Sequence, residues 1–401
     1  MKIKQHQIVI IGGGTAGITV ASSLFRKDNS LDIAIIEPSA KHYYQPGLTF
    51  VGAGIFTRKE IERNEEDVIP ACARWIKDAA AKLLPDQNKI VLKSGEEIQY
   101  HFLVLCPGIQ INWDTIHGLN ESLGKNGVCS NYSPDFAPYT HECIKSFRGG
   151  TAIFTQPNTP MKCGGAAQKA MYLASDYFRR KGLLDNAEVR FTTAAGEIFG
   201  IKIFADTLTK VVQRYGIKTF WHHNLKEIKH DTREAVFDLL EEGKPVSEVT
   251  MKYDMIHVTP PMSAPDFIRE SPLANHAGWT DLDKYTLQHK RYMNVFGLGD
   301  ASGTPNAKTG AAVRKQAPVV VNNLLQYMKS GSISNPVKYN GYGSCPIATG
   351  YGKLLLIEFD YDKKPTPTFP LDPSRERYSM WLLKRYFLPW FYWNRMLKGK
   401  L

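Results

Sequence analysis

A glycine-rich turn near the start of the chain restricts the fold more than any other feature. An apolar strand is predicted at Ile8–Ile11, and it leads into the sequence Gly12-Gly13-Gly14-Thr15-Ala16-Gly17 and a predicted helix at residues 18–26. A second predicted strand, residues 32–36, ends at Glu37. A GxGxxG match alone is weak, but a strand before it, a helix after it and an acid after the next strand make it specific. The sequence therefore predicts a dinucleotide-binding unit.

The residues of this unit have separate physical roles. The glycines allow the backbone to approach a pyrophosphate, and the helix N-terminus faces the negative charge. Glu37 can accept a hydrogen bond from a ribose 2′-OH, and its charge would repel the 2′-phosphate of NADP. The predicted cofactor-binding residues of the unit are Gly12, Gly14, Thr15, Ala16, Gly17 and Glu37.

A second feature, far along the chain, indicates the same cofactor. Residues 294–300 form an apolar strand that ends in Gly299-Asp300. This pattern resembles the second flavin fingerprint of flavoproteins with two dinucleotide-binding domains, in which the aspartate binds the ribityl chain of FAD. The small residues at 305–313 predict a helix that starts against the flavin, with Gly310 at the cofactor. Two distant segments thus predict FAD.

Composition narrows the range of partners. The chain has 401 residues, enough for two or three domains, and its 43% hydrophobic and 22% charged content is usual for a globular protein. A formal charge of +11 suits an anionic membrane surface, an anionic substrate or nucleic acid. No arginine-rich block or nucleic-acid motif is present, which argues against nucleic acid. Six irregularly spaced cysteines predict neither a disulfide framework nor a metal site.

Residues 157–165 have the outline of a second nucleotide-binding turn with different chemistry. They follow a predicted strand at 151–155 and precede a predicted helix at 166–180. A second Gly-rich loop for NAD(P)H is expected at such a position, but the segment carries two prolines and Cys163. Lys162 and the helix N-terminus both favour a thiolate at Cys163. For an isolated cysteine, a small buried side chain behind a tight turn is the simpler interpretation.

These patterns predict an α/β fold. It has two Rossmann-like domains of the disulfide-reductase flavoprotein type and a C-terminal amphipathic region that associates with membranes. We expect residues 1–147 to be the first part of the FAD-binding domain and residues 291–338 its second part. Residues 148–290 are expected to form the second Rossmann-like domain, which carries Cys163. Residues 339–401 are expected to form the C-terminal region, which carries Cys345.

The C-terminal segment Arg375–Leu401 interleaves aromatic and basic residues around a predicted break at Pro389. Such a segment can lie in lipid headgroups with its apolar face down; packing on its own core or on another subunit, as in a homo-oligomer, is an equal alternative. No apolar run reaches the roughly 20 residues that span a bilayer, and no leader precedes the first strand. The sequence therefore predicts peripheral attachment to a bacterial cytoplasmic membrane, on its cytoplasmic face. The aromatic, apolar and basic residues of this segment are Trp381, Leu382, Leu383, Tyr386, Phe387, Leu388, Trp390, Phe391, Tyr392, Trp393, Arg377, Lys384, Arg385, Arg395 and Lys398.

Four motifs together resemble sulfide:quinone oxidoreductase, most of all the branch that includes the mitochondrial enzyme. They are Pro157-Asn158-Thr159-Pro160-Met161-Lys162-Cys163, His257-Val258-Thr259-Pro260-Pro261-Met262-Ser263, Gly341-Tyr342-Gly343-Ser344-Cys345-Pro346 and Glu358-Phe359-Asp360-Tyr361. The resemblance covers nearly the whole chain. It implies that Cys163 and Cys345 are the redox cysteine pair and that Glu37, Gln45 and Asp300 contact FAD. Cys129 lies where some branches carry a third cysteine, and it stays outside the predicted mechanism.

The resemblance also implies a reaction. Sulfide attacks Cys345 in the oxidised pair and leaves a persulfide there, while Cys163 passes two electrons to FAD and onward to a membrane quinone. The persulfide sulfur leaves to a small acceptor such as sulfite, a thiol or sulfide.

Three other functions are weighed against this one. A type II NADH:quinone oxidoreductase has a similar fold, but it needs the Gly-rich loop that Cys163 replaces. The flavin subunit of a flavocytochrome sulfide dehydrogenase would be exported with a haem partner, and neither a leader nor a CxxCH is present. A non-catalytic FAD-binding protein docked on a membrane would have no need of both special cysteines.

Overall fold

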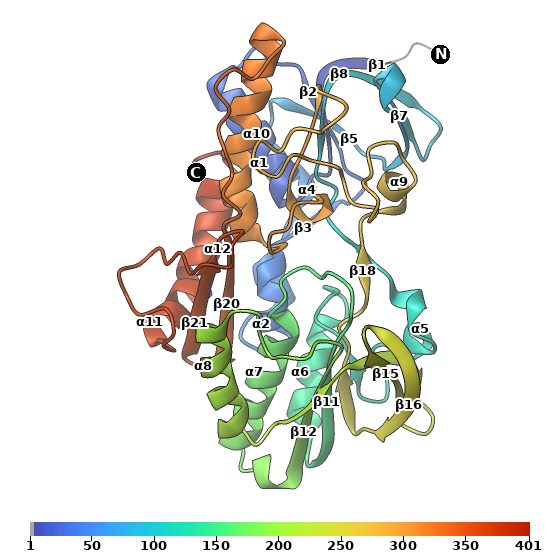
Figure 1. Ribbon diagram of the computed structural model, residues 1–401, viewed down its shortest axis with the longest axis vertical. Coiled ribbons are helices and arrows are strands. Elements are labelled where there is room, and N and C mark those ends of the chain that lie inside the picture. Colours follow the sequence, from blue (N-terminus) through green and yellow to red (C-terminus); the bar gives the residue numbers. More distant parts are fainter. Residues whose placement is uncertain (1–3) are drawn as a thin grey trace.

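The computed structural model describes residues 4–401, and the predicted glycine-rich unit lies in its larger sheet (Figure 1). β1 (Lys4–Ile11) lies between β2 (Ile33–Ile36) and β8 (Glu97–Leu105), and all three strands are parallel. β5 (Ala73–Ile76) extends the sheet beyond β2, and β19 (Val295–Gly297) pairs with the second half of β8. The strand before Gly299-Asp300 therefore belongs to the same sheet as β1, the strand that precedes the glycine turn.

Two long helices cover this sheet. α1 (Thr15–Lys27) follows the glycine turn, and α10 (Gly310–Ser330) follows Asp300 and packs against α1. At the other edge of the sheet, β7 (Lys89–Leu92) pairs antiparallel with the first half of β8, and β6 (Ala80–Leu84) pairs antiparallel with β7. The predicted helix at residues 18–26 is thus confirmed, with one more turn at its start.

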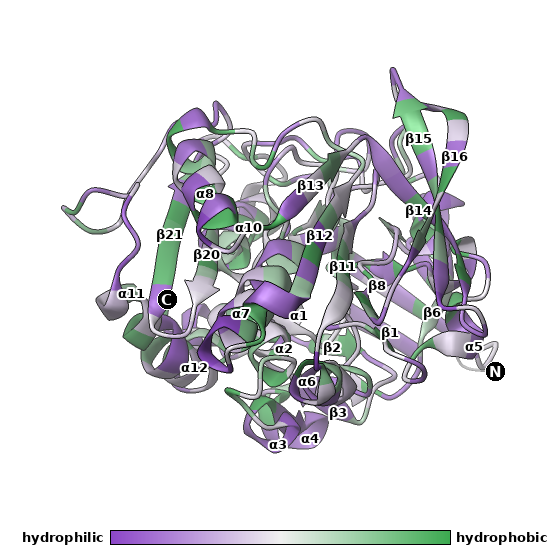
Figure 2. Cartoon of the chain, turned by 90° about the horizontal axis from the view of Figure 1, so that it is seen from below, coloured by the Kyte–Doolittle hydropathy of each residue, from purple (hydrophilic) through white to green (hydrophobic). Residues whose placement is uncertain are grey.

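A second parallel sheet contains the strand before Cys163. Its order is β10 (Val128–Cys129), β17 (Met255–His257), β11 (Gly150–Gln156), β12 (Ala187–Thr193) and β13 (Lys218–Trp221). The predicted strand at 151–155 is confirmed as β11. Figure 2 shows β21 (Lys353–Phe359), in the C-terminal region, mostly green, because it contains the apolar run Leu354–Ile357. α7 (Ala166–Arg180) and α8 (Lys202–Arg214) are the two long helices between the strands of this sheet. A separate antiparallel sheet of β14 (His223–Lys229), β15 (Glu234–Glu241) and β16 (Lys244–Lys252) adjoins it. The two-Rossmann fold class is confirmed.

One expected division differs from the packing. A boundary at 290 assigns residues 264–290 to the second domain, whereas Ala264, Ile268 and Leu273 lie in the hydrophobic core of the first sheet. The chain returns to the first domain just after β18 (Met262–Ser263), which pairs with β9 (Gln110–Ile111) between the two sheets. The apolar residues after Pro261 pack on the first sheet because α9 (Asp266–Arg269) docks on β6.

The C-terminal region begins with an antiparallel hairpin of β20 (Gly343–Gly350) and β21, and β20 lies along α7. The chain then forms a helical run through α11 (Tyr378–Leu382), η6 (Leu383–Phe387), α12 (Leu388–Phe391) and η7 (Tyr392–Met396). The expected break at Pro389 is wrong, since Phe387 and Leu388 both have helical backbone angles. The wider π turn of η6 precedes the proline and can accommodate its ring.

Candidate active site

The structure places Cys163 and Cys345 side by side, although 182 residues separate them. Their Sγ atoms are 3.3 Å apart. Cys163 lies in the turn between β11 and α7, and Cys345 lies on β20, which packs along α7. Gly165 makes this approach possible, because a Cβ atom there would come within 2.7 Å of the Cys345 sulfur. A disulfide would need the two sulfurs to move to about 2.05 Å.

The backbone at Cys163 is held in an unusual conformation. Its φ of 55° lies in the left-handed region, which non-glycine residues rarely adopt. The Cys163 N–H donates to the carbonyl of Lys308 at 2.9 Å, which ties the turn to the segment just before α10. Strain of this kind persists where the surroundings hold it and is frequent at functional sites.

A buried lysine supports a thiolate at Cys163. Lys169 lies in the first turn of α7, only 3% of it is exposed, and its Nζ donates to the Cys163 sulfur at 2.9 Å. The hydrogen bond from Cys345 and the charge of Lys169 together hold the pKa of the Cys163 thiol well below its usual range, against the effect of burial. Burial disfavours the charge of Lys169, yet the adjacent thiolate raises its pKa. The two groups form a buried ion pair.

Cys345 has the opposite character. Its hydrogen bond to Cys163 and its burial raise the pKa of its thiol well above the usual value. In the reduced pair, Cys345 is therefore the thiol that donates, and Cys163 is the thiolate that accepts. Only 3% of Cys345 is exposed.

The C-terminal helical run contributes a second buried lysine. Lys384 is 3% exposed, its Nζ donates to the carbonyl of Pro46 at 3.3 Å, and it lies 4.9 Å from the centre of the Phe50 ring. Burial, with repulsion from Lys169, lowers the pKa of Lys384 to about 7. Lys384 therefore does not lie among lipid headgroups, which corrects the expectation for this residue.

Gln45 is connected to this site by a hydrogen bond from Lys162, the residue before Cys163. Lys162 donates its Nζ to Gln45 Oε1. The Lys162 pKa is lowered by burial. Lys308 donates to the carbonyls of Asp300 and Ser302, at 2.7 and 2.9 Å, and burial lowers its pKa to about 8. The segments that carry Gln45, Asp300 and Cys163 therefore converge.

The glycine turn fits a dinucleotide. Gly12 has φ of 106°, and a Cβ atom on Gly17 would come within 1.9 Å of the Gly12 carbonyl. A Cβ atom on Gly14 would meet no atom within 4 Å, so open space lies beside the turn where a pyrophosphate would sit. Thr15 and Ala16 begin α1, and Glu37 accepts from the Gly13 N–H at 2.8 Å.

The flavin end fits as well. Gly310 starts α10, Thr309 caps that helix by accepting from the Ala312 N–H, and a Cβ atom on Gly310 would find only Pro46, at 4.0 Å. Burial raises the pKa of Asp300, against the charges of Lys162 and Lys308. The residues present therefore fit FAD, with Glu37 where a ribose hydroxyl is expected and Asp300 where the ribityl chain is expected.

The other cysteines lie apart from this pair. Cys106 is buried beside the glycine turn, and Cys129 is fully buried with its Sγ 3.5 Å from the Ile256 carbonyl. Burial and contact with Cys143 raise the pKa of Cys129. Neither residue has a hydrogen bond to Cys163 or Cys345 among those of residues 4–401.

Comparisons with known proteins agree with this geometry. Residues 6–134 match the pyridine nucleotide-disulphide oxidoreductase family. The mitochondrial sulfide:quinone oxidoreductase of Dictyostelium discoideum is 47% identical, and the match covers 98% of this chain and 86% of that protein. The chain belongs to the sulfide:quinone oxidoreductase family. The mitochondrial sulfide:quinone oxidoreductase of Mus musculus is 44% identical, over 98% of this chain and 87% of that protein.

A solved structure shows the same fold. The sulfide:quinone oxidoreductase of Aquifex aeolicus superposes with a TM-score of 0.80 over 98% of this chain and 92% of that chain, at 18% identity. The protein is thus an FAD-dependent oxidoreductase that takes electrons from sulfide and passes them to a quinone. The expectation of a bacterial cytoplasmic membrane is not supported, because the Dictyostelium discoideum and Mus musculus relatives are both named as mitochondrial enzymes.

Two residues at the centre of the site were missed from the sequence. Lys169 had a detectable signal, because it is a charged residue with Ala166, Ala167, Ala170 and Met171 around it in a predicted helix. Lys384 had none, since a lysine in an aromatic and basic segment is expected to face lipid or water.

Proposed function

We propose that Cys163 and Cys345 carry the sulfide chemistry, with different roles. In the oxidised enzyme the two sulfurs are joined. HS⁻ attacks the sulfur of Cys345, the bond between the cysteines breaks, Cys345 becomes a persulfide, and Cys163 leaves as a thiolate. The observation that supports this direction is the buried Lys169 Nζ, 2.9 Å from the Cys163 sulfur, because a cation there favours the Cys163 thiolate and so makes it the better leaving group.

Lys169 stabilises that leaving thiolate. Its Nζ already lies 2.9 Å from the Cys163 sulfur, so the charge that develops on Cys163 meets a fixed cation without reorganisation. When bound beside Cys163, FAD supplies the acceptor for two electrons and their transfer to quinone. The residues proposed to hold it are Gly12, Gly14, Thr15, Ala16, Gly17, Glu37, Gln45, Asp300 and Gly310.

The positive charge around the pair bears on the sulfur acceptor. Lys169 and Lys384 are both buried beside it, and their positive charges repel each other. An anionic acceptor such as sulfite, a thiolate or a second sulfide suits this surrounding. The acceptor removes the outer sulfur of the Cys345 persulfide, and Cys345 and Cys163 can then rejoin when their electron pair has left.

The persulfide can be located directly. After brief treatment with sulfide in the absence of acceptor, alkylation and peptide mass spectrometry should find one additional sulfur on the peptide that contains Cys345. The peptide that contains Cys163 should carry the alkyl group alone. Additional sulfur on Cys163 and none on Cys345 would reverse the proposed roles.

We further propose that the C-terminal run docks the protein on a membrane through one aromatic patch. The patch consists of Leu382, Tyr386, Phe387 and Trp390, which are 38%, 63%, 48% and 52% exposed. Their spacing places them on one face of the helical run, and exposed aromatic residues are typical of membrane interfaces. Among residues 4–401, no helix is long and apolar enough to cross a bilayer. The proposed attachment, through this patch, is peripheral.

Replacing Tyr386, Phe387 and Trp390 with serine should lower binding to liposomes by at least about tenfold, because three apolar side chains then stay in water. Turnover with a long-chain quinone should fall, while turnover with a short, water-soluble quinone is kept. Tyr285→Ser, at a 42% exposed site elsewhere, is the matched control. Cosedimentation with liposomes measures the effect, and unchanged binding of the triple variant would exclude this patch as the anchor.

For the domain division, we propose the four expected parts with one change. The second Rossmann-like domain starts at 148 and ends before Ala264, and the following residues join the FAD-binding domain. The packing of Ile268 and Leu273 supports this change.

A further inference from the structure

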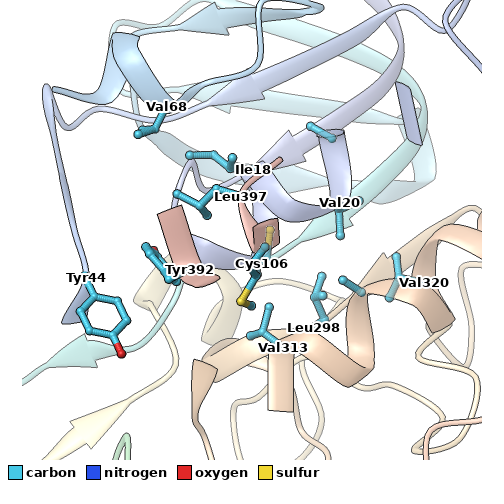
Figure 3. Close-up of a cluster of buried hydrophobic side chains, with 14 of the residues drawn as sticks. Ile18, Val20, Tyr44, Val68, Cys106, Leu298, Val313, Val320, Tyr392 and Leu397 are labelled. Atoms are coloured by element: carbon cyan, nitrogen blue, oxygen red, sulfur yellow. The ribbon is translucent and has the colours of Figure 1, made fainter. Parts of the chain in front are cut away.

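The last helical turns of the chain are buried in the FAD-binding domain. Tyr392 and Leu397 are 4% and 1% exposed, and Figure 3 shows them among side chains of α1 and α10, including Ile18 and Val313. The Ser22 hydroxyl donates to the Leu397 carbonyl at 2.8 Å. A Cβ atom on Gly399 would come within 2.7 Å of the α1 backbone at Ser22. This end of the chain is therefore fitted closely to the first helix of the glycine-rich unit.

Tyr392 connects this segment to the glycine turn by two hydrogen bonds. Its Oη lies 2.8 Å from Thr15 Oγ1, at the first residue of α1, and 2.6 Å from His42 Nε2. His42 Nδ1 lies 3.3 Å from Glu65 Oε2. One direction of donation satisfies all of these contacts: Thr15 donates to Tyr392, Tyr392 donates to His42, and the His42 Nδ1–H donates to Glu65.

The chain of hydrogen bonds ends at a carboxylate oxygen with no partner. Glu65 is 1% exposed, and its Oε1 has no hydrogen bond to any residue in the range 4–401. A Cβ atom built on Gly13 would lie 2.8 Å from this oxygen and 2.7 Å from the Glu37 side chain. Glu65 Oε1 and Glu37 thus border the same point of the glycine turn. A buried acceptor without a donor is costly, and it indicates a ligand group that donates there.

The ligand chemistry at this point is a ribose hydroxyl. Glu37 already accepts from the backbone N–H groups of Gly13 and Ser39. A second carboxylate beside it would repel a phosphate oxygen, whereas it would accept from a hydroxyl. The adenosine ribose is the part of a dinucleotide that lies next to the acid after the second strand.

We propose that Glu65 is a second ribose-binding carboxylate of the FAD site and that Tyr392, through His42 and Thr15, is the residue that positions it. The C-terminal run then has two functions. Its exposed patch, which ends at Trp390, docks on the membrane, and Tyr392, two residues later, positions Glu65. FAD retention therefore depends on the packing of the C-terminal run against the FAD-binding domain. This proposal rests on FAD binding at the glycine turn and not on the roles of the cysteines, so the two can fail separately.

Tyr392→Phe tests it with little change in packing, because the ring still contacts Tyr44, whose centroid is 4.9 Å away. FAD release from the diluted holoenzyme, followed by the return of free-flavin fluorescence, should be about fivefold to tenfold faster, as expected for loss of a buried hydrogen bond that positions a ligand group. Glu65→Gln should have a similar effect, and the double variant should be little worse than either single one. Tyr386→Phe, at an exposed site on the same run, should release FAD at the wild-type rate.

A second ligand separates cofactor binding from a general effect on stability. ADP carries the ribose and pyrophosphate but no flavin, so its affinity for the FAD-depleted protein should fall in Tyr392→Phe by the same factor as that of FAD. Unchanged FAD release in both Tyr392→Phe and Glu65→Gln would overturn the proposal. A loss of FAD affinity without any loss of ADP affinity would overturn it as well, because the effect would then not lie at the ribose.

Discussion

Replacing either Cys163 or Cys345 with serine is expected to lower sulfide-dependent quinone reduction by roughly three orders of magnitude or more, because a hydroxyl is a far weaker nucleophile than a thiolate at neutral pH and cannot form the disulfide. The two residues act on one path, so the double variant should be little worse than either single variant. Steady-state turnover with a soluble quinone measures the effect.

Cys72→Ser is the matched control, since Cys72 lies outside the site and burial raises the pKa of its thiol. It should keep turnover near the wild-type value. If Cys345→Ser retained more than about a tenth of wild-type turnover, a tenfold change corresponding to about 1.4 kcal/mol, sulfide would not need that sulfur.

Lys169→Met should have the second-largest effect, a loss of roughly tenfold to a hundredfold in turnover at pH 7, because a neutral side chain no longer stabilises the buried thiolate. The Cys163 pKa is lowered in the folded protein, so its thiolate is present at neutral pH and is lost only as the pH falls through the lowered value. Removing Lys169 raises that pKa, and the pH at which turnover rises should move upward.

Two measurements check this effect. The pH dependence of turnover should shift, and alkylation of Cys163 in the reduced enzyme should need a higher pH than in the wild type. Lys181→Met, an exposed lysine just after the same helix, is the control and should change neither. A Lys169→Met enzyme with the wild-type pH profile would show that Lys169 does not stabilise the thiolate.

The sequence could predict the FAD-binding unit because its signals are local. The strand, the glycine turn, the helix and Glu37 are contiguous, and backbone geometry requires glycine at φ of 106° and at the contact between Gly12 and Gly17. Gly299-Asp300 was recognisable for the same reason. The fold class followed from these two segments and is confirmed.

Local signals could not show which residues meet at the cysteine site. The approach of Cys345 to Cys163 depends on β20 packing along α7, a contact between segments far apart in the sequence. Lys384 reaches the pair only because the C-terminal run returns over the FAD-binding domain. The tail itself has two faces, and sequence composition alone could not separate the buried Trp381 and Tyr392 from the exposed Tyr386 and Trp390.

The central claim is that electrons from sulfide enter through Cys163, and anaerobic addition of sulfide to purified Cys163→Ser tests it most directly. The absorbance of the bound flavin in the wild type and in Cys72→Ser should bleach rapidly. The flavin of Cys163→Ser should remain bound and oxidised on the same timescale. Bleaching of Cys163→Ser at a rate near that of the wild type would contradict the claim.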